Sequence, residues 1–143
     1  MSETFHTRVL VDSGPLVAIF RQKDQHHRAC VETLAHIVPP LLTSWPVLTE
    51  AAYLLRDSTA ATEKLMAGPV MGLFRILPLE AEDLPAMSGL LRKYHKLGAQ
   101  LADVSLVHLA DREGIHTVFT LDRRDFRVFR RAGNRSFQLL PSA

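Results

Sequence analysis

Four acidic residues stand in apolar segments of this chain, where an unpaired negative charge is unfavourable: Asp12, Glu50, Asp103 and Asp122. Asp12 follows an uninterrupted apolar run at residues 9–11, and the other three interrupt or end apolar runs of their own. Burying a carboxylate costs free energy unless it is protonated, paired or bound to a cation. Four such positions in one short chain indicate a shared ligand, and a metal ion is the simplest one.

The types of side chain available favour Mg²⁺ or Mn²⁺ as that ion. Both prefer carboxylate and water oxygens. The seven histidines are scattered, the chain has one cysteine, and no HExxH or paired-cysteine motif occurs, so a zinc site is not expected. Ser13 lies outside a G-x-S-x-G motif, and no nucleotide-binding glycine motif is present. We therefore expect Ser13 and Thr120 to hydrogen-bond the acids or to position a water.

Each acid also has a purely structural interpretation, which stays open at this point. Asp12 and Asp122 could be turn or helix-capping residues. Asp103 could stabilise the start of its helix through the helix dipole. Glu50 could face solvent, because helix phase is uncertain by a residue or two. The pattern of all four is more specific than any one of them.

Length and composition predict one domain over residues 1–143. Apolar residues make up 47% of the chain, which is enough for a hydrophobic core. The single cysteine, Cys30, excludes an internal disulfide framework and favours a reducing compartment. No signal peptide and no apolar stretch of membrane-spanning length is visible. We expect a soluble, cytoplasmic protein that does not contact a membrane.

Short apolar strands alternate with helices along the chain. Strands are predicted at 8–12, 41–43, 74–79, 117–121 and 137–140. A first helix is predicted to begin at 13–15, and further helices at 24–37, 44–57, 60–66, 82–97 and 100–113, with a turn and short helix at 122–131. This alternation predicts an α/β fold with a mostly parallel central sheet and helices on both faces. Ligands gather at the carboxyl ends of such strands, so all four acids can reach one rim of the sheet.

The basic residues between positions 112 and 135 are all arginines. A guanidinium-rich stretch beside an acidic site suits a phosphate-bearing ligand, although a solvated arginine face would read the same way. The candidates for gripping phosphates are Arg123, Arg124, Arg127 and Arg130. Trp45 and Tyr53 flank Glu50 and could stack bases, but core packing is the expected role of Trp45.

With these blocks in place, the chain resembles a PIN domain, and within that family the VapC-type ribonuclease toxins. The resemblance rests on Val11-Asp12-Ser13-Gly14-Pro15-Leu16, on Thr49-Glu50, on Leu101-Ala102-Asp103-Val104-Ser105-Leu106-Val107, and on the block from Thr120 to Phe126. Their order and spacing match the family over nearly the whole chain. Val104 stands where the family commonly has alanine, a change that should not affect the chemistry.

The resemblance implies a three-layer α/β/α sandwich and Mg²⁺- or Mn²⁺-dependent hydrolysis of RNA phosphodiester bonds. The family's metal-binding, catalytic acids correspond to Asp12, Glu50, Asp103 and Asp122. Asp12 and Asp103 would hold one ion directly, and Glu50 and Asp122 would hold its waters or complete a second site. The family's hydroxyl before the last acid corresponds to Thr120, and Asp125 takes an auxiliary role.

The implied partners are an RNA substrate, a cognate antitoxin protein and a second copy in a homodimer. Alternatives are a PIN-fold nuclease that processes RNA without being a toxin, and a catalytically silent PIN-fold interaction module. A phosphatase or receiver domain would also place an aspartate at a strand end. However, Gly14 stands where a phosphatase needs its second aspartate, and no lysine follows a late strand.

Overall fold

The computed structural model describes residues 5–142 of the chain and contains a five-stranded sheet. Its strands are β1 (Val9–Val11), β2 (Leu41–Thr43), β3 (Phe74–Ile76), β4 (Thr117–Phe119) and β5 (Gln138–Leu140). The strand order is β3-β2-β1-β4-β5, and all neighbouring strands pair in parallel. The predicted α/β class with a parallel sheet is confirmed. The predicted domain over residues 1–143 also includes 1–4 and 143, which lie outside the described residues.

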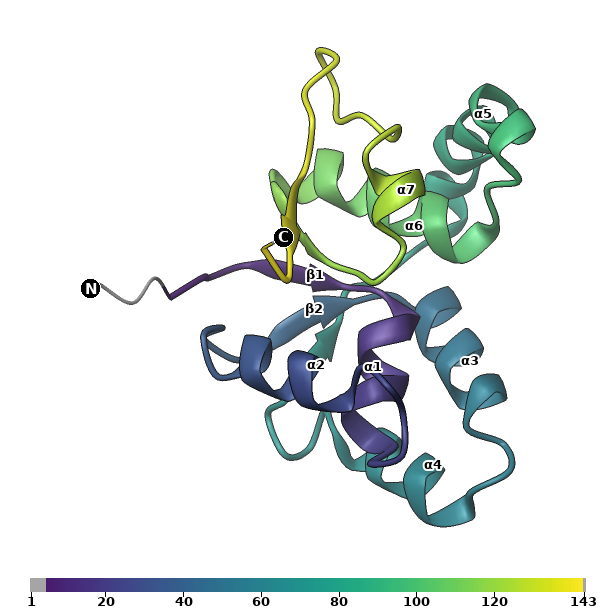
Figure 1. Ribbon diagram of the computed structural model, residues 1–143. Helices are drawn as coiled ribbons and strands as arrows, with labels where there is room; N and C mark the ends of the chain where they lie inside the picture. The colour runs from purple at the N-terminus through teal and green to yellow at the C-terminus, as the bar shows by residue number, and fades with distance from the viewer. Residues whose placement is uncertain (1–4, 143) are drawn as a thin grey trace.

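Helices flank the sheet on both sides (Figure 1). Helices α1 to α4 lie together on one side of strand β1, and α5 to α7 lie on the other. Their bounds are α1 Ser13–Phe20, α2 His27–Leu34, α3 Trp45–Leu54, α4 Thr59–Ala67, α5 Leu84–Lys93, α6 Leu101–Glu113 and α7 Arg123–Phe126, with 3₁₀ turns η1 Ala81–Asp83 and η2 His95–Leu97. Within residues 5–142, none of the helices combines the length and the hydropathy needed to cross a bilayer.

The register of β1 against β4 decides where the functional residues meet. Val11 lies opposite Phe119 in this pair, and the Asp12 backbone N–H continues the ladder by donating to the Phe119 carbonyl at 2.9 Å. The residue after each strand, Asp12 and Thr120, therefore emerges side by side at the carboxyl edge of the sheet. The strands that precede Asp12 and Asp122 are thus neighbours, which is the condition under which the two acids share an edge of the sheet.

Two predicted helices differ from the structure for local reasons. The helix predicted at 82–97 is divided into η1, α5 and η2, because Glu80 and Asp83 form a capping box that starts a separate turn. The helix predicted from Asp24 begins at His27 instead. Asp24 accepts a hydrogen bond from the His26 N–H at 2.8 Å, so it organises the preceding turn rather than the helix.

The hydrophobic core fills the space between sheet and helices, and aromatic residues fix the short helix α7. Phe126 and Phe129 are fully buried and meet edge to face with ring centroids 5.0 Å apart. Phe129 makes a similar contact with Tyr94, whose hydroxyl accepts a hydrogen bond from the Arg130 N–H. Such contacts add to the free energy of burial. They hold the segment that carries Asp122 and Asp125 against the core.

Candidate active site

Asp12 is a buried carboxylate that accepts hydrogen bonds from two neighbouring donors. It follows β1 and is the N-cap of α1, where its Oδ1 accepts from the Ser13 N–H at 2.8 Å. Its Oδ2 accepts from the Thr120 hydroxyl at 2.9 Å. The side chain is 6% exposed. Asp12 therefore caps its helix, as the structural interpretation allowed, and in the same position presents a desolvated negative charge at the rim.

Ser13 connects Asp12 to Glu50. Its hydroxyl donates to Glu50 Oε1 at 2.9 Å, while its backbone N–H donates to Asp12 Oδ1. Glu50 lies in the second turn of α3 and is half-buried, so the solvent-facing interpretation is wrong for this residue. The predicted role of Ser13 as a hydrogen-bonding partner of the acids agrees with these contacts.

A buried pair of hydroxyls sets α3 against α6, and sequence reasoning missed it. Ser105 donates to the Ala102 carbonyl at 2.7 Å, so the 2.7 Å contact between Ser44 and Ser105 must use the proton of Ser44. Ser44 also caps α3 by accepting from the Val47 N–H. Both serines are fully buried. This clamp fixes the helix that carries Glu50 relative to the helix that carries Asp103, and only their contact across the fold reveals it.

Asp103 sits in the first turn of α6 with one of its oxygens engaged. Its Oδ2 accepts from the Gln100 N–H at 3.0 Å, which closes a capping box with Gln100. The predicted helix-start role is therefore present as well. The residue is half-buried, so the carboxylate lies between the helix start and solvent.

Thr120 links Asp122 to Asp12. Its hydroxyl accepts from the Asp122 N–H at 3.0 Å while it donates to Asp12. Asp122 is the N-cap of α7, and its Oδ1 accepts from the Asp125 N–H at 3.3 Å. A single fully buried threonine thus couples the end of β4 to the carboxylate that follows β1.

The electrostatics of these acids show that they share one region. Burial, and then the charges of Asp103 and Glu50, raise the pKa of Asp12 to about 7 against the lowering effect of its two hydrogen bonds. Burial also raises the pKa of Asp103, with further contributions from the charges of Asp122, Glu50 and Asp125. Burial and the neighbouring Asp122 raise the pKa of Asp125. For Asp12, Asp103 and Asp125, neighbouring negative charges add to the effect of burial, which is the pattern expected of a cluster without a compensating cation.

Within residues 5–142, no lysine, arginine or histidine nitrogen lies within ion-pairing distance of these five carboxylates. In the same range, no three acidic, histidine or cysteine side chains form a ready-made set of metal ligands. The donor set, one buried carboxylate and several half-buried ones, nevertheless fits a hard divalent cation that keeps several of its waters. A cation here would be held by one or two carboxylates directly and by the others through water.

The four candidate phosphate-binding arginines divide into two pairs. Arg123 donates to the Pro141 carbonyl and Arg130 to carbonyls of residues 127–129, so backbone oxygens already engage these two guanidinium groups. Arg124 and Arg127 are exposed. The positive charge of Arg124 offsets part of the rise in the pKa of Asp125, so this arginine is near that acid.

Two aromatic residues of α3 are exposed. Trp45 is 58% and Tyr53 61% exposed, so the expectation that Trp45 packs in the core is wrong. Trp45 occupies the first position of α3, outside the apolar face that Val47, Leu48 and Ala51 bury. Tyr53 carries the guanidinium of Arg56 over its ring at 3.9 Å.

Comparison with known proteins agrees with this arrangement. The PIN domain family matches residues 9–133 of the chain. Ribonuclease VapC26 of Mycobacterium tuberculosis is 28% identical over 138 residues, which cover 93% of this chain and all of that protein.

Two solved structures share the fold. The crystal structure of Mycobacterium tuberculosis VapC20, a Sarcin-Ricin loop cleaving toxin, has a TM-score of 0.70 at 19% identity and covers 77% of this chain and 86% of that one. VapBC2 from Rickettsia felis, bound to a DNA fragment from its promoter, has a TM-score of 0.60 at 14% identity and covers 94% and 98%. Because the family match spans most of the sequence, this chain belongs to the PIN domain family.

Proposed function

We propose that this protein is a metal-dependent endoribonuclease that hydrolyses RNA phosphodiester bonds, and that it is the toxin of a toxin–antitoxin pair. The observation that carries the proposal is the cluster of carboxylates around Asp12, whose pKa is raised to about 7 and which no protein cation balances within residues 5–142. Buried acids with perturbed pKa values cluster at functional sites. The relative named as a ribonuclease supports RNA as the substrate.

Asp12 and Asp103 are the residues that would hold Mg²⁺ or Mn²⁺ directly, with Glu50 and Asp122 holding its waters. The ion, when bound, supplies charge stabilisation at the scissile phosphate and lowers the pKa of water. Both oxygens of Asp12 are oriented by neighbours, Oδ1 by Ser13 and Oδ2 by Thr120, and one oxygen of Asp103 is oriented by Gln100. Such supporting hydrogen bonds hold a carboxylate in place and leave further lone pairs free to bind a cation or its waters.

Ser13 and Asp125 have supporting roles in this scheme. Ser13 holds one oxygen of Glu50, which leaves the other to orient an attacking water or to accept its proton. Asp125 donates its backbone N–H to Asp122 and adds negative charge beside it. Arg124 and Arg127, exposed next to these acids, would bind the phosphates on either side of the cleaved bond.

The acidic rim is the edge of the sheet that carries Asp12, Glu50, Asp103, Asp122 and Asp125. An antitoxin would inhibit by covering this rim, and a homodimer could place two such rims on one particle. The VapBC2 structure, by its title, holds such a pair of proteins. The rival proposals are an RNA-processing nuclease that is not a toxin and an interaction module without catalysis. The four carboxylates are all present, which favours catalysis over the silent module.

The test is RNA cleavage by Asp103→Asn, with Glu63→Gln as the matched control on an exposed, distant position of α4. We expect Asp103→Asn to lose at least about a hundredfold in Mg²⁺-dependent cleavage while it stays folded, and Glu63→Gln to keep wild-type activity. Full activity of Asp103→Asn would refute the proposed site. Growth arrest on expression of the chain alone, relieved in Asp103→Asn, separates a toxin from an RNA-processing enzyme.

A further inference from the structure

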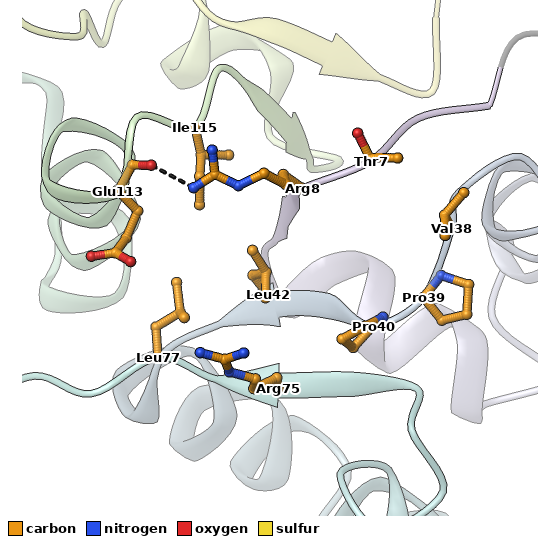
Figure 2. A pocket seen from close by; sticks show the side chains of 10 residues that line it. All are labelled: Thr7, Arg8, Val38, Pro39, Pro40, Leu42, Arg75, Leu77, Glu113 and Ile115. Carbon is orange, nitrogen blue, oxygen red and sulfur yellow. Dashed lines mark hydrogen bonds between the residues drawn. The ribbon is translucent and has the colours of Figure 1, made fainter.

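A second concave site lies over one face of the sheet, mostly toward the amino ends of the strands, whereas the acids lie at the carboxyl ends. It is a cavity of about 330 Å³, formed where the chain enters β1, β2 and β4 and along the edge strand β3 (Figure 2). Arg8 stands immediately before β1, whereas Asp12 follows the same strand. These two residues are therefore about 13 Å apart along the strand, at 3.3 Å per residue.

The cavity exists because the helices leave part of one sheet face open. The register puts Leu42 opposite both Leu10 and Arg75, so these three side chains share a face. Leu10, in the central strand, is fully buried. Leu42 is half-buried and Arg75 is exposed, so cover is lost toward the β3 edge. The lining is apolar: Leu77 and Ile115 are buried beneath it, and its exposed apolar surface comes from residues 38–40.

Two guanidinium groups face this lining. Arg8 adopts a left-handed backbone conformation, with φ 54°, and donates from one nitrogen to the carbonyl of Glu113 at the end of α6. A guanidinium carries five N–H donors, so most of those of Arg8 stay available. Arg75 has no ion pair within residues 5–142, and Figure 2 draws no hydrogen bond from it.

The charged and apolar parts of the cavity are segregated. Figure 2 shows the guanidinium groups of Arg8 and Arg75 toward the Glu113 and Leu77 end, and Pro39 and Pro40 at the other end. The Glu113 carboxylate turns away from Arg8 in this view and pairs with Arg112 Nε at 2.9 Å. The Glu113 carboxylate is thus already paired with Arg112 and does not neutralise Arg8 or Arg75.

We propose that this cavity binds a small organic anion, with its carboxylate or phosphate between Arg8 and Arg75 and its apolar body on Pro39 and Pro40. Guanidinium groups match the planar or tetrahedral oxygens of both head groups. An apolar pocket with a few polar groups at one end is the usual form of a small-ligand site, and this volume is at the small end of the range. The proposal is independent of the ribonuclease function, because none of these residues belongs to the acidic rim.

The experiment is titration of the ¹⁵N-labelled full chain with phenyl phosphate, benzoate, inorganic phosphate and benzyl alcohol. We expect phenyl phosphate or benzoate to shift the amide signals of Leu42, Arg75 and Ile115, and the stronger of the two identifies the preferred head group. Inorganic phosphate lacks the apolar body and benzyl alcohol lacks the charge, so both should bind at least about tenfold more weakly. If neither phenyl phosphate nor benzoate shifts these signals at millimolar concentration, the proposal is overturned.

Variants at an exposed position separate the charge from the fold. Arg75→Gln should weaken binding at least about tenfold, Arg75→Lys should bind at an intermediate level, and Arg28→Gln, on the exposed face of α2, should bind as the wild type. RNA cleavage by Arg75→Gln should be unchanged. Wild-type affinity in both Arg75 variants would contradict the proposal. So would shifts that map to the Asp122 edge, or displacement of the probe by short single-stranded RNA.

Discussion

Asp12 and Asp83 are both aspartates beside the start of a helical segment, yet their surroundings drive their pKa values in opposite directions. Asp83 accepts from the Glu80 N–H, from His108 at 2.7 Å and from Arg112 at 3.2 Å, and these partners lower its pKa to about 2. Asp12 is surrounded by other acids, and its burial raises its pKa to about 7. Asp83, whose role is to hold the start of α5 against α6, has the cationic side chain of Arg112 as a partner, and Asp12 has none.

The comparison teaches that the acidic rim is not a general property of this molecule. Of the described acids, Asp57, Glu32, Asp83 and Glu113 each have an arginine within ion-pairing distance. The rim acids have hydroxyl and backbone donors instead, which orient a carboxylate without neutralising it. An external cation is the partner that this arrangement lacks, and the following experiments are designed to break or sharpen the contrast.

The largest contrast should appear in RNA cleavage. Asp12→Asn removes the central carboxylate of the rim and should reduce Mg²⁺-dependent cleavage at least about a hundredfold. Asp83→Asn removes an equally well-ordered acid outside the rim, so it should lower the melting temperature and leave the cleavage rate of the folded protein within a few-fold of wild type. Comparable losses in both variants, measured on folded protein, would remove the functional distinction between the two acids.

Thr120→Val should show how much the neutral hydroxyl of Thr120 contributes to holding the Asp12 carboxylate in position for a cation. The change removes the hydroxyl that donates to Asp12 and accepts from the Asp122 N–H, while it keeps the shape of the side chain. Loss of such a supporting bond typically lowers metal affinity by about 10- to 100-fold. Calorimetric titration with Mn²⁺ measures it, with Thr62→Val on α4 as a control for the substitution itself. Unchanged affinity would mean that Thr120 has only a packing role.

Asp12 and Asp83 should make the free energy of unfolding depend on pH in opposite directions. The pKa of Asp12 is higher in the folded than in the unfolded chain, so the folded state binds more protons and metal-free stability should fall as pH rises from about 4 to about 7. The expected loss is of the order of 4 kcal/mol. Asp83 has a lowered pKa, so its contribution is lost only as pH falls from about 4 to about 2.

Urea unfolding in the presence of a chelator measures this dependence. Asp12→Asn should abolish most of the loss between pH 4 and 7 and should be more stable than wild type at pH 8. A metal-free wild type whose stability is flat over that interval would show that the carboxylate at Asp12 is already compensated.

The sequence was sufficient for the local parts of the site and insufficient for the parts that depend on packing. An apolar run followed by an acid and a helix start located Asp12, and a strongly apolar helix located Asp103. The contact between Ser44 and Ser105 joins residues 61 positions apart and leaves no local signal. The exposure of Trp45 was misjudged because its size favoured the core, whereas its place at the start of α3 turns it outward.

Strand order had the same limit. Each strand could be recognised from its composition, but the neighbour of β1 could not, since β4 pairs with it from more than a hundred residues away. The acidic rim depends on that pairing, because it brings Thr120 to Asp12. The alternation of strands and helices along the sequence therefore predicted the class of fold, and only the folded chain shows which strand ends meet.

The most direct test is calorimetric titration of the metal-free protein with Mn²⁺ at pH 6 and pH 8, in two buffers of different ionisation enthalpy. We predict saturable binding that is tighter at pH 8 and releases protons at pH 6, because Asp12 must ionise to act as a ligand. We also predict that Asp12→Asn loses this binding while Asp83→Asn keeps it. Binding that is equal in wild type and Asp12→Asn, or absent from both, would contradict the claim that the rim is built for a divalent cation.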